Sequence, residues 1–304
     1  MPGTPGTYTD VAARSMNTYV QAGVSGVMTG GLYAVMALGL SLTWGLLKVI
    51  NLAHFALILG SAYITYQVTT STGADPLLSG LIVVPGMFAV GVAIQWVIDR
   101  FQVDEFNSLL LSFGLFIIAI QLINNIWSAD FRQIEADENP YATRAFFVGS
   151  IAFPVPQLMA LGTALALAVA TYVVLRYTHF GRALRALAYD REIAGAYGVD
   201  HRRIGMLTAG LASAMAALAG VLIGINQAVF PQLAAEWVGL VFAVVILGGI
   251  GNLLGAVAAG ILIGLVYSQV SVAWDPLGAP LVVFLLLILA LLFRPNGLFG
   301  RLGS

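Results

Sequence analysis

The chain has 304 residues, of which 60% are hydrophobic and only 9% are charged, and its formal net charge is -1. A soluble domain carries about 25% charged residues, so this chain has too little polar surface to cover a water-soluble globule of its size. It contains no cysteine, which excludes disulfides, thiolate metal sites and cysteine catalysis. The composition predicts an all-α polytopic membrane protein, built from apolar helices of about 20 residues.

The chain begins with a polar segment, residues 1–18, whose first thirteen residues are rich in Gly, Pro and Thr. This segment lacks the basic start and the apolar centre of a signal peptide. We therefore expect a polar N-terminal tail at the membrane surface, followed by a single transmembrane domain over residues 19–304.

Apolar runs follow the tail, and each is a candidate membrane segment. They cover residues 19–43, 49–70, 76–98, 106–127, 156–175, 204–228, 237–249, 253–272 and 277–293. The seventh is too short to cross comfortably and ends at a Gly-rich break, so it either crosses or re-enters as a half-helix. The prediction is a transmembrane helical bundle of about eight or nine segments, including a broken or re-entrant helix near 237–252.

Basic residues set the predicted orientation. The loop 176–203 holds six arginines against three acids, and such loops stay in the cytoplasm because Lys and Arg resist translocation. With that loop and the C-terminus inside, only Arg14, Arg132 and Arg144 of the thirteen Lys and Arg lie outside. The loop 128–149 is then extracytoplasmic. Nine crossings put the N-terminus outside, whereas one re-entrant segment would put it inside.

The charged loop 176–203 also has a predicted structure. Residues 182–189 and 191–197 each have the pattern of a short helix. Gly181 is expected to break the chain before the first helix, and Gly198 is suited to cap the second because Gly tolerates a left-handed backbone. Two short helices at the membrane surface would form a docking platform for another protein.

The predicted spans contain no Asp, Glu, Lys or Arg. Carriers driven by protons or sodium need ionisable groups within the membrane, and here only His54 is offered. The only lysine, Lys48, fits no phosphate-binding loop, so active transport would need energy from another chain, delivered at 182–203. No carboxylates are placed for acid–base catalysis, and we expect neither catalytic nor metal-binding residues.

Few polar groups are candidates to line a pathway. Asn51 and His54 are three residues apart, and the side-chain oxygen of Asn51 could cap a helix with His54 one turn on. The alternative is a buried polar pair bonded to neighbouring helices. Asn226 and Gln227 lie near the outer end of another span, where interhelical or interfacial hydrogen bonds are the alternative role.

Three blocks of sequence, spread over nearly the whole chain, form a specific combination although each alone is weak. They are Gly-Leu-Tyr-Ala at 31–34 through Val-Ile-Asn-Leu-Ala-His at 49–54, then 181–186 through 198–204, and finally 247–256 with the tail 294–300. Together they resemble the membrane permeases of the high-affinity branched-chain amino-acid ABC importers.

The resemblance implies a permease subunit in a bacterial cell (inner) membrane, paired with a second, related permease and surrounded by lipid. It also implies two cytoplasmic ATPases that hold ATP and Mg²⁺, and an extracytoplasmic solute-binding protein. For this chain itself it implies no cofactor and no nucleic acid. The expected ATPase-coupling residues lie in the charged loop: Arg182, Arg185, Asp190, Arg191, Glu192, Ala194, Gly198, Asp200 and Arg203.

Asn51 and His54 match the asparagine and histidine that this family places near the pathway. The family commonly follows that histidine with Gly and an acidic residue, whereas this chain has Phe55 and Ala56. Phe55 thus joins the candidate pathway residues, and an obvious carboxylate partner for a substrate ammonium group is missing. Branched-chain or other amino acids, urea, short amides and aromatic acids all stay open as solutes.

Two other hypotheses stay open. A stand-alone channel or facilitator for a small neutral solute explains the uncharged spans but gives the loop 176–203 no purpose. Deletion of residues 191–200 would spare transport by such a channel. A membrane scaffold without transport has little in its favour.

Overall fold

A computed structural model describes residues 8–299 of the chain. In that range most of the chain is helical, with one small two-stranded hairpin. The elements are α1 (Tyr8–Leu42), the π-helical turn η1 (Thr43–Leu47), α2 (Ala53–Thr72), α3 (Pro76–Arg100), α4 (Glu105–Trp127), β1 (Ala145–Val148), β2 (Ile151–Pro154), α5 (Val155–Tyr177), α6 (His179–Tyr189), α7 (Arg191–Ala196), α8 (His201–Asn226), α9 (Leu233–Gly248), α10 (Leu253–Ala273) and α11 (Ala279–Phe293).

Six helices in the described part of the chain are long and apolar enough to cross a membrane: Met16–Leu47 (α1 with η1), α3, Phe106–Trp127 of α4, α5, α8 and α10. The helix α2 has 20 residues, whereas α9 and α11 have only 16 and 15. Sixteen helical residues reach about 24 Å, less than the ~30 Å hydrocarbon core. A polytopic helical bundle is therefore confirmed, and the shortness of α9 agrees with the sequence prediction.

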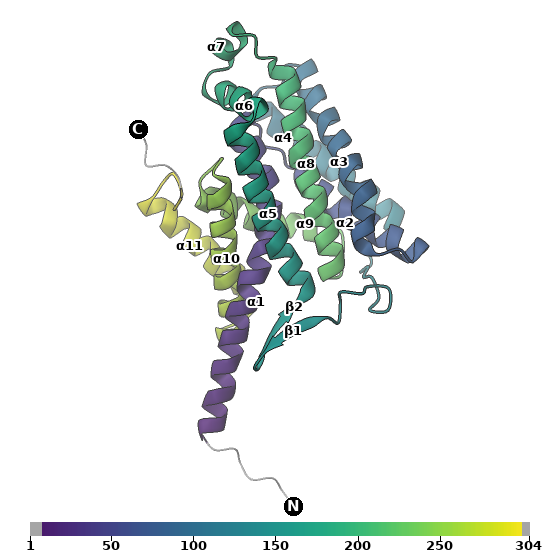
Figure 1. Cartoon of the computed structure of the whole chain (residues 1–304), viewed down its shortest axis with the longest axis vertical. Helices are drawn as coiled ribbons and strands as arrows, with labels where there is room; N and C mark the ends of the chain where they lie inside the picture. Colours follow the sequence, from purple (N-terminus) through teal and green to yellow (C-terminus); the bar gives the residue numbers. More distant parts are fainter. Residues whose placement is uncertain (1–7, 300–304) are drawn as a thin grey trace, which may run out of the picture.

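The helix α1 lies at the centre of the bundle, where it packs against α5, α8, α9 and α10 (Figure 1). The helix α8 packs in turn along α2 and α3, and α4 packs on α2. Small residues allow the closest of these approaches. A Cβ added at Gly30 of α1 would lie 2.5 Å from the carbonyl oxygen of Gly260 in α10, so the two backbones touch there.

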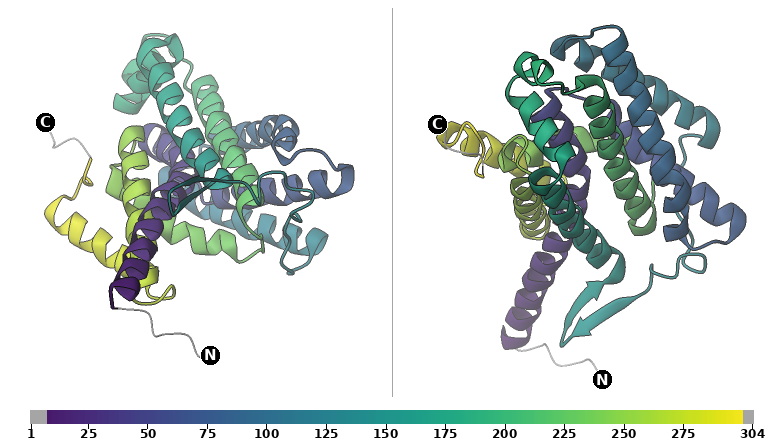
Figure 2. Two further views of the ribbon diagram at one scale, coloured as in Figure 1. Left: turned by 60° about the horizontal axis from the view of Figure 1, so that its bottom comes forward. Right: turned by 45° about the horizontal axis from the view of Figure 1, so that its top comes forward.

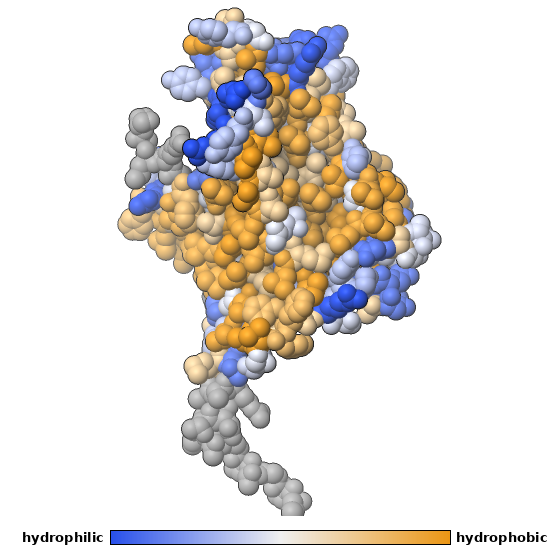
Figure 3. All heavy atoms as spheres, in the orientation of Figure 1, coloured by the Kyte–Doolittle hydropathy of each residue, from blue (hydrophilic) through white to orange (hydrophobic). Residues whose placement is uncertain are grey.

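The two ends of the bundle carry different structures. The short helices α6 and α7 project from one end, and the β1–β2 hairpin lies at the other, beside the first half of α1 (Figures 1 and 2). On the face that Figure 3 shows, apolar side chains cover the surface between the ends, and polar ones gather over α6 and α7. The loops 176–203 and 128–149 thus lie at opposite ends, as the predicted topology requires.

The first helix begins within the predicted N-terminal tail. Helix α1 begins at Tyr8, not near residue 19, so part of the expected tail 1–18 is helical. The sequence from Tyr8 to Gln21 contains neither Gly nor Pro, and nothing there breaks a helix that continues into the membrane segment. Residues 1–7 lie outside the described range.

The hairpin β1–β2 follows the outer loop and leads directly into α5. Its antiparallel register pairs Phe146 with Phe153, and its two-residue turn has Gly149 at φ +63°. The side-chain amide of Gln21 in α1 bonds both backbone groups of Ala152, at 2.9 Å as donor and 2.8 Å as acceptor. This contact ties the hairpin to α1, and the sequence did not predict it.

Candidate functional site

The charged platform, defined here as residues 176–203, is built from three helix starts that each use a side-chain cap. The Thr178 hydroxyl accepts from the Gly181 amide at 3.1 Å and starts α6. Asp190 accepts from the amides of Glu192 and Ile193, both at 2.9 Å, and starts α7. Because a cap satisfies amides that have no helical partner, the platform has a defined shape without a partner protein.

The third acid of the platform begins α8. Asp200 accepts from the amides of Arg202 and Arg203 at 3.1 and 3.2 Å, and its other oxygen pairs with the Arg203 guanidinium at 3.0 Å. Asp190 and Asp200, predicted as coupling residues, are therefore helix caps in this structure. Their carboxylates also suit the positive ends of the helix dipoles.

Gly198 ends α7 as the sequence predicted. Its φ is +83°, its amide donates to the Gly195 carbonyl at 2.9 Å, and the Val199 amide donates to the Ala194 carbonyl at 3.1 Å. This pair of bonds is the Schellman pattern, in which a left-handed residue closes the helix. No atom lies within 4 Å of a Cβ built at Gly198, so backbone conformation alone explains the glycine.

Gly181 does not break the chain, so that prediction was wrong. It lies inside α6, where it is buried, and a Cβ added to it would lie 2.2 Å from the Leu175 carbonyl oxygen. The glycine is therefore needed for the close approach of α6 to the end of α5. Such an approach depends on two segments, and the local sequence does not reveal it.

Two platform arginines hold α6 against α5. Arg185 donates to the Leu175 carbonyl, and Arg182 donates to the Tyr177 carbonyl at 3.3 Å. These carbonyls belong to the last turn of α5 and lack helical partners, so the arginines satisfy them. Displacement of α6 would therefore be passed directly to α5.

The outward surface of the platform is aromatic as well as charged. Tyr189 and Tyr197 are 91% and 86% exposed, and Glu192 is exposed beside them. Ala194 is instead buried, at 4% exposure, so it lies on the inner side of α7 and does not face outward. Sequence reasoning missed the two tyrosines, although each stands next to a helix boundary in a charged segment.

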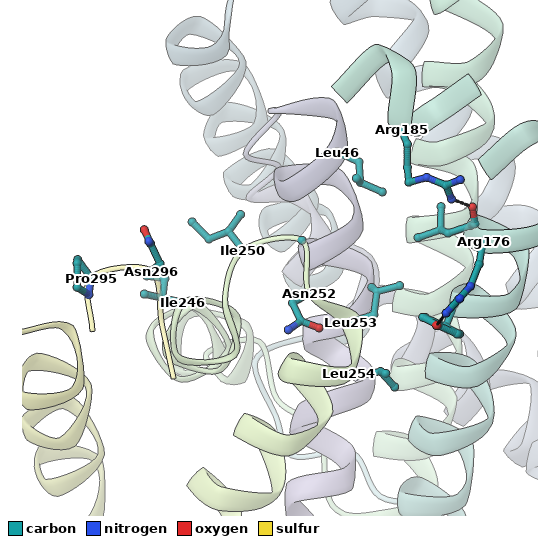
Figure 4. Close-up of a pocket in the computed structure, with 13 residues that line it drawn as sticks. Leu46, Arg176, Arg185, Ile246, Ile250, Asn252, Leu253, Leu254, Pro295 and Asn296 are labelled. Atoms are coloured by element: carbon teal, nitrogen blue, oxygen red, sulfur yellow. Dashed lines mark hydrogen bonds between the residues drawn. The ribbon is translucent and has the colours of Figure 1, made fainter. Parts of the chain in front are cut away.

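A cavity of about 1010 Å³ lies beside the platform (Figure 4). Arg176 and Arg185 face it from one side, and the turn between α9 and α10 faces it from the other, with Asn252 and Leu253. Asn296 of the C-terminal tail also lines the cavity.

The C-terminal tail is bound to this turn. The Leu298 amide donates to the Leu247 carbonyl at 2.8 Å, and the Asn252 side-chain amide donates to the Phe299 carbonyl at 2.7 Å. Asn252 also caps α10 through the Gly255 amide at 3.0 Å. The Gly-rich break and the tail, which together form the third block of the sequence resemblance, are therefore bonded to each other near the platform.

His54 and Phe55 are buried inside the bundle. The Nε2 atom of His54 lies 2.9 Å from the Met36 carbonyl oxygen of α1, and a Cβ at Gly39 would lie 2.6 Å from the histidine ring. Phe55 stacks on Phe242 of α9 with ring centroids 6.0 Å apart. This geometry favours the packing alternative for His54, because its ring fills a notch between α1 and α2.

Asn51 does not cap α2 with its side chain, contrary to the sequence prediction. The cap position is Leu52, and the Leu52 amide donates to the Ser112 hydroxyl oxygen of α4 at 3.0 Å. The Ser112 hydroxyl also donates to the Ile50 carbonyl at 3.2 Å. The Asn51 Oδ1 atom is buried and has no hydrogen-bond partner within the described residues.

Asn226 and Gln227 differ from each other. The Asn226 amide donates to the Pro156 carbonyl at 3.2 Å and to the Leu222 carbonyl at 2.9 Å, which links α8 to α5. Gln227 is exposed where α8 ends. Asn226 therefore has the interhelical role that the sequence analysis gave as its alternative.

Residues 8–299 contain no cluster of His, Asp or Glu that could hold a metal ion.

The comparisons with known proteins decide the family. The family described as "Branched-chain amino acid transport system / permease component" matches residues 24–293. The chain belongs to this family. It is therefore a multi-pass membrane permease subunit, as the sequence resemblance implied.

Named relatives match along almost the whole chain. The permease protein LivH of Escherichia coli K12, from a high-affinity branched-chain amino acid transport system, is 26% identical over 298 residues, covering 93% of this chain and 96% of LivH. BraD of Pseudomonas aeruginosa is 28% identical over 301 residues with the same coverages. A probable LivM permease of Methanocaldococcus jannaschii matches 40% of this chain and 39% of its own length at 29% identity.

Proposed function

We propose that this permease forms the translocation pathway of an ATP-binding-cassette importer together with a second, related permease in a bacterial cell membrane. Two cytoplasmic ATPases that bind ATP and Mg²⁺ would drive it, and an extracytoplasmic protein would deliver the solute. The observation that carries the proposal is the capped, outward-facing platform at one end of a bundle whose predicted membrane spans contain no Asp, Glu, Lys or Arg. The match of one region to a LivM permease supports a related partner.

The platform is connected to the bundle in a way that suits alternating access. Arg182 and Arg185 bond the end of α5, and Asp200 begins α8 directly after the platform. Helix α8 packs along α2 and α3, and α5 packs along α1. A displacement of α6 and α7 by nucleotide-bound ATPases would therefore reach helices on both sides of α1.

The solute we propose is a small amino acid or a related small molecule, such as urea, a short amide or an aromatic acid. The names of LivH and BraD favour a branched-chain amino acid. Phe55 and Ala56 provide no carboxylate beside His54, which favours recognition by polar uncharged groups such as the unpartnered Asn51 amide oxygen. A ligand screen on the cognate solute-binding protein tests the solute class.

The function itself is tested by reconstitution in proteoliposomes. Both permeases, the ATPases and the binding protein should accumulate the solute only when ATP is present. Matched vesicles that contain an ATPase variant unable to hydrolyse ATP are the control. Uptake without ATPases or nucleotide would contradict the proposal and favour a stand-alone channel, for which removal of residues 191–200 should leave transport intact.

A further inference from the structure

The coupling helix α7 has an ion pair with the membrane bundle that the sequence does not suggest. Arg191, its first residue, places a guanidinium nitrogen 3.6 Å from the Oδ1 atom of Asp99. Asp99 belongs to the last turn of α3, and the two residues lie far apart in the chain. The pair therefore joins α7 to a helix that is neither of its neighbours in sequence.

The carboxylate of this pair is buried, whereas the guanidinium is not. The Asp99 side chain is 10% exposed and that of Arg191 is 61% exposed. The Asp99 Oδ2 atom is buried without a hydrogen-bond partner in the described part of the chain, next to Gly205 of α8. Burial of a carboxylate costs free energy unless it is fully paired. An apolar residue at position 99 would therefore stabilise the fold more than Asp99 does.

Packing alone holds α7 weakly. Ala194 is its only buried residue, and the element against which it packs is α6. The contact between Arg191 and Asp99 thus gives α7 a second attachment, directly to the bundle. Because α3 packs along α8, this attachment lies on a helix that contacts the one following the platform in the chain.

The pair also has room to rearrange. A cavity of about 370 Å³ lies at this position, and Lys48, Asp99, Arg191 and His201 are among the residues that line it. The unpartnered Oδ2 atom and the nearby cations permit the carboxylate to exchange partners when α7 moves. A tightly packed apolar contact would not permit such an exchange.

We propose that Asp99 is a positioning residue for transport, which holds Arg191 and transmits the movement of α7 to α3. This inference rests on the proposed function as an ATP-driven importer. In this account α6 moves α5 through Arg182 and Arg185, while α7 moves α3 through Arg191 and Asp99. The platform therefore acts on the bundle at two separate points.

The test uses the complete reconstituted importer with the variants D99N, R191Q and the double variant. We expect uptake per ATP hydrolysed to fall about fivefold in each single variant. The double variant should be no worse than either single variant, because both changes remove the same contact. D104N is the matched control: it changes another carboxylate of the same cavity, and Asn preserves its cap on the Asn107 amide.

A second measurement separates transmission of movement from general stability. The chain has no cysteine, so single cysteines can be placed at Phe101 after α3 and at Tyr197 after α7. Trapping of the nucleotide state should change the labelling rate at both positions in the otherwise unaltered chain. In D99N, the change at Y197C should persist and the change at F101C should be lost.

The outcomes distinguish the two proposals. If the unaltered complex shows no ATP-dependent uptake, the proposed function fails. If it transports, but D99N and R191Q keep the normal uptake per ATP, the positioning role of Asp99 is wrong. It is also wrong if F101C does not respond to nucleotide in the unaltered complex, or responds equally in D99N.

Discussion

In soluble proteins the buried helices are usually more apolar than the exposed ones. The buried helices α1 and α8 and the exposed helices α3 and α4 of this bundle show the opposite order. The most apolar windows of α1 and α8 are each 72% buried and have mean hydropathies of 1.5 and 2.0. Those of α3 and α4 are only 17% buried, yet their mean hydropathies are higher, 2.3 and 2.1. The outer helices of this bundle are thus more apolar than the inner ones.

The difference follows from the solvent. Lipid tails are as apolar as leucine, so an outer helix needs large apolar side chains, such as the exposed Phe113 and Ile117 of α4. An inner helix instead needs small residues for close approach and polar groups that find partners. Thr208 and Ser213 of α8 are buried, and the Thr208 hydroxyl donates to the Ile204 carbonyl at 2.7 Å.

The largest expected effect comes from filling an inner crossing. Gly30→Leu would force a side chain into the Gly260 backbone, since even a Cβ would lie 2.5 Å from its carbonyl oxygen. We expect a loss on the order of 3 kcal/mol of stability, and little assembled permease after mild heating in detergent. Gly114→Ala on α4, where a Cβ meets nothing within 4 Å, is the matched control and should stay within about 1 kcal/mol. Equal behaviour of the two variants would remove the distinction between inner and outer helices.

A polar inner residue gives the next largest effect. His54→Ala removes the bond to the Met36 carbonyl and empties the notch beside Gly39, so we expect a loss of about 2 kcal/mol. Transport by the surviving complex should keep its normal KM. Phe113→Ala, a large side chain on the outside of α4, should cost less. A raised KM at unchanged stability would instead place His54 in contact with the solute.

Gly198 is required for its backbone conformation, whereas Gly30 is required for the close approach of two helices. The surroundings of Gly198 are open, but its φ of +83° disfavours a β-branched side chain by about 1–3 kcal/mol. Because no segment in the described part of the chain packs on Gly198, Gly198→Val should leave the amount of assembled permease unchanged. The strain should instead alter the end of α7 and lower uptake per ATP hydrolysed. Gly195→Ala, with open surroundings and no positive φ, should leave coupling intact. Normal coupling in the Gly198 variant would mean that the shape of α7 does not matter for transport.

Local signals in the sequence predicted much of this fold. Apolar runs located the helices of the bundle, and the charged segment gave both short helices and the Gly198 cap. The hairpin had a local signal too, Gly149-Ser150 between apolar residues, which is typical of a two-residue turn. It was missed because an uncharged run before a membrane span resembles the span itself.

Contacts between distant segments could not be predicted in this way. Gly181 resembles a helix breaker unless the end of α5 is known to lie against it. Asn51 resembles a cap until Ser112 of α4 is seen to bond the next amide. Asp99 resembles an ordinary charge at the end of a span, and only the fold shows that it is buried beneath Arg191. Each depends on tertiary packing, on which the local pattern carries no information.

The most direct measurement of the central claim is the side of the membrane on which the platform lies. Single cysteines at Tyr197 after α7 and at Phe147 in the hairpin are exposed, at 86% and 72% for the native side chains, and lie at opposite ends of the molecule. With a membrane-impermeant thiol reagent, intact cells should label Y197C only after permeabilisation and label F147C at once. Labelling of Y197C from outside, with F147C protected, would contradict a pathway driven from the cytoplasm through α6 and α7.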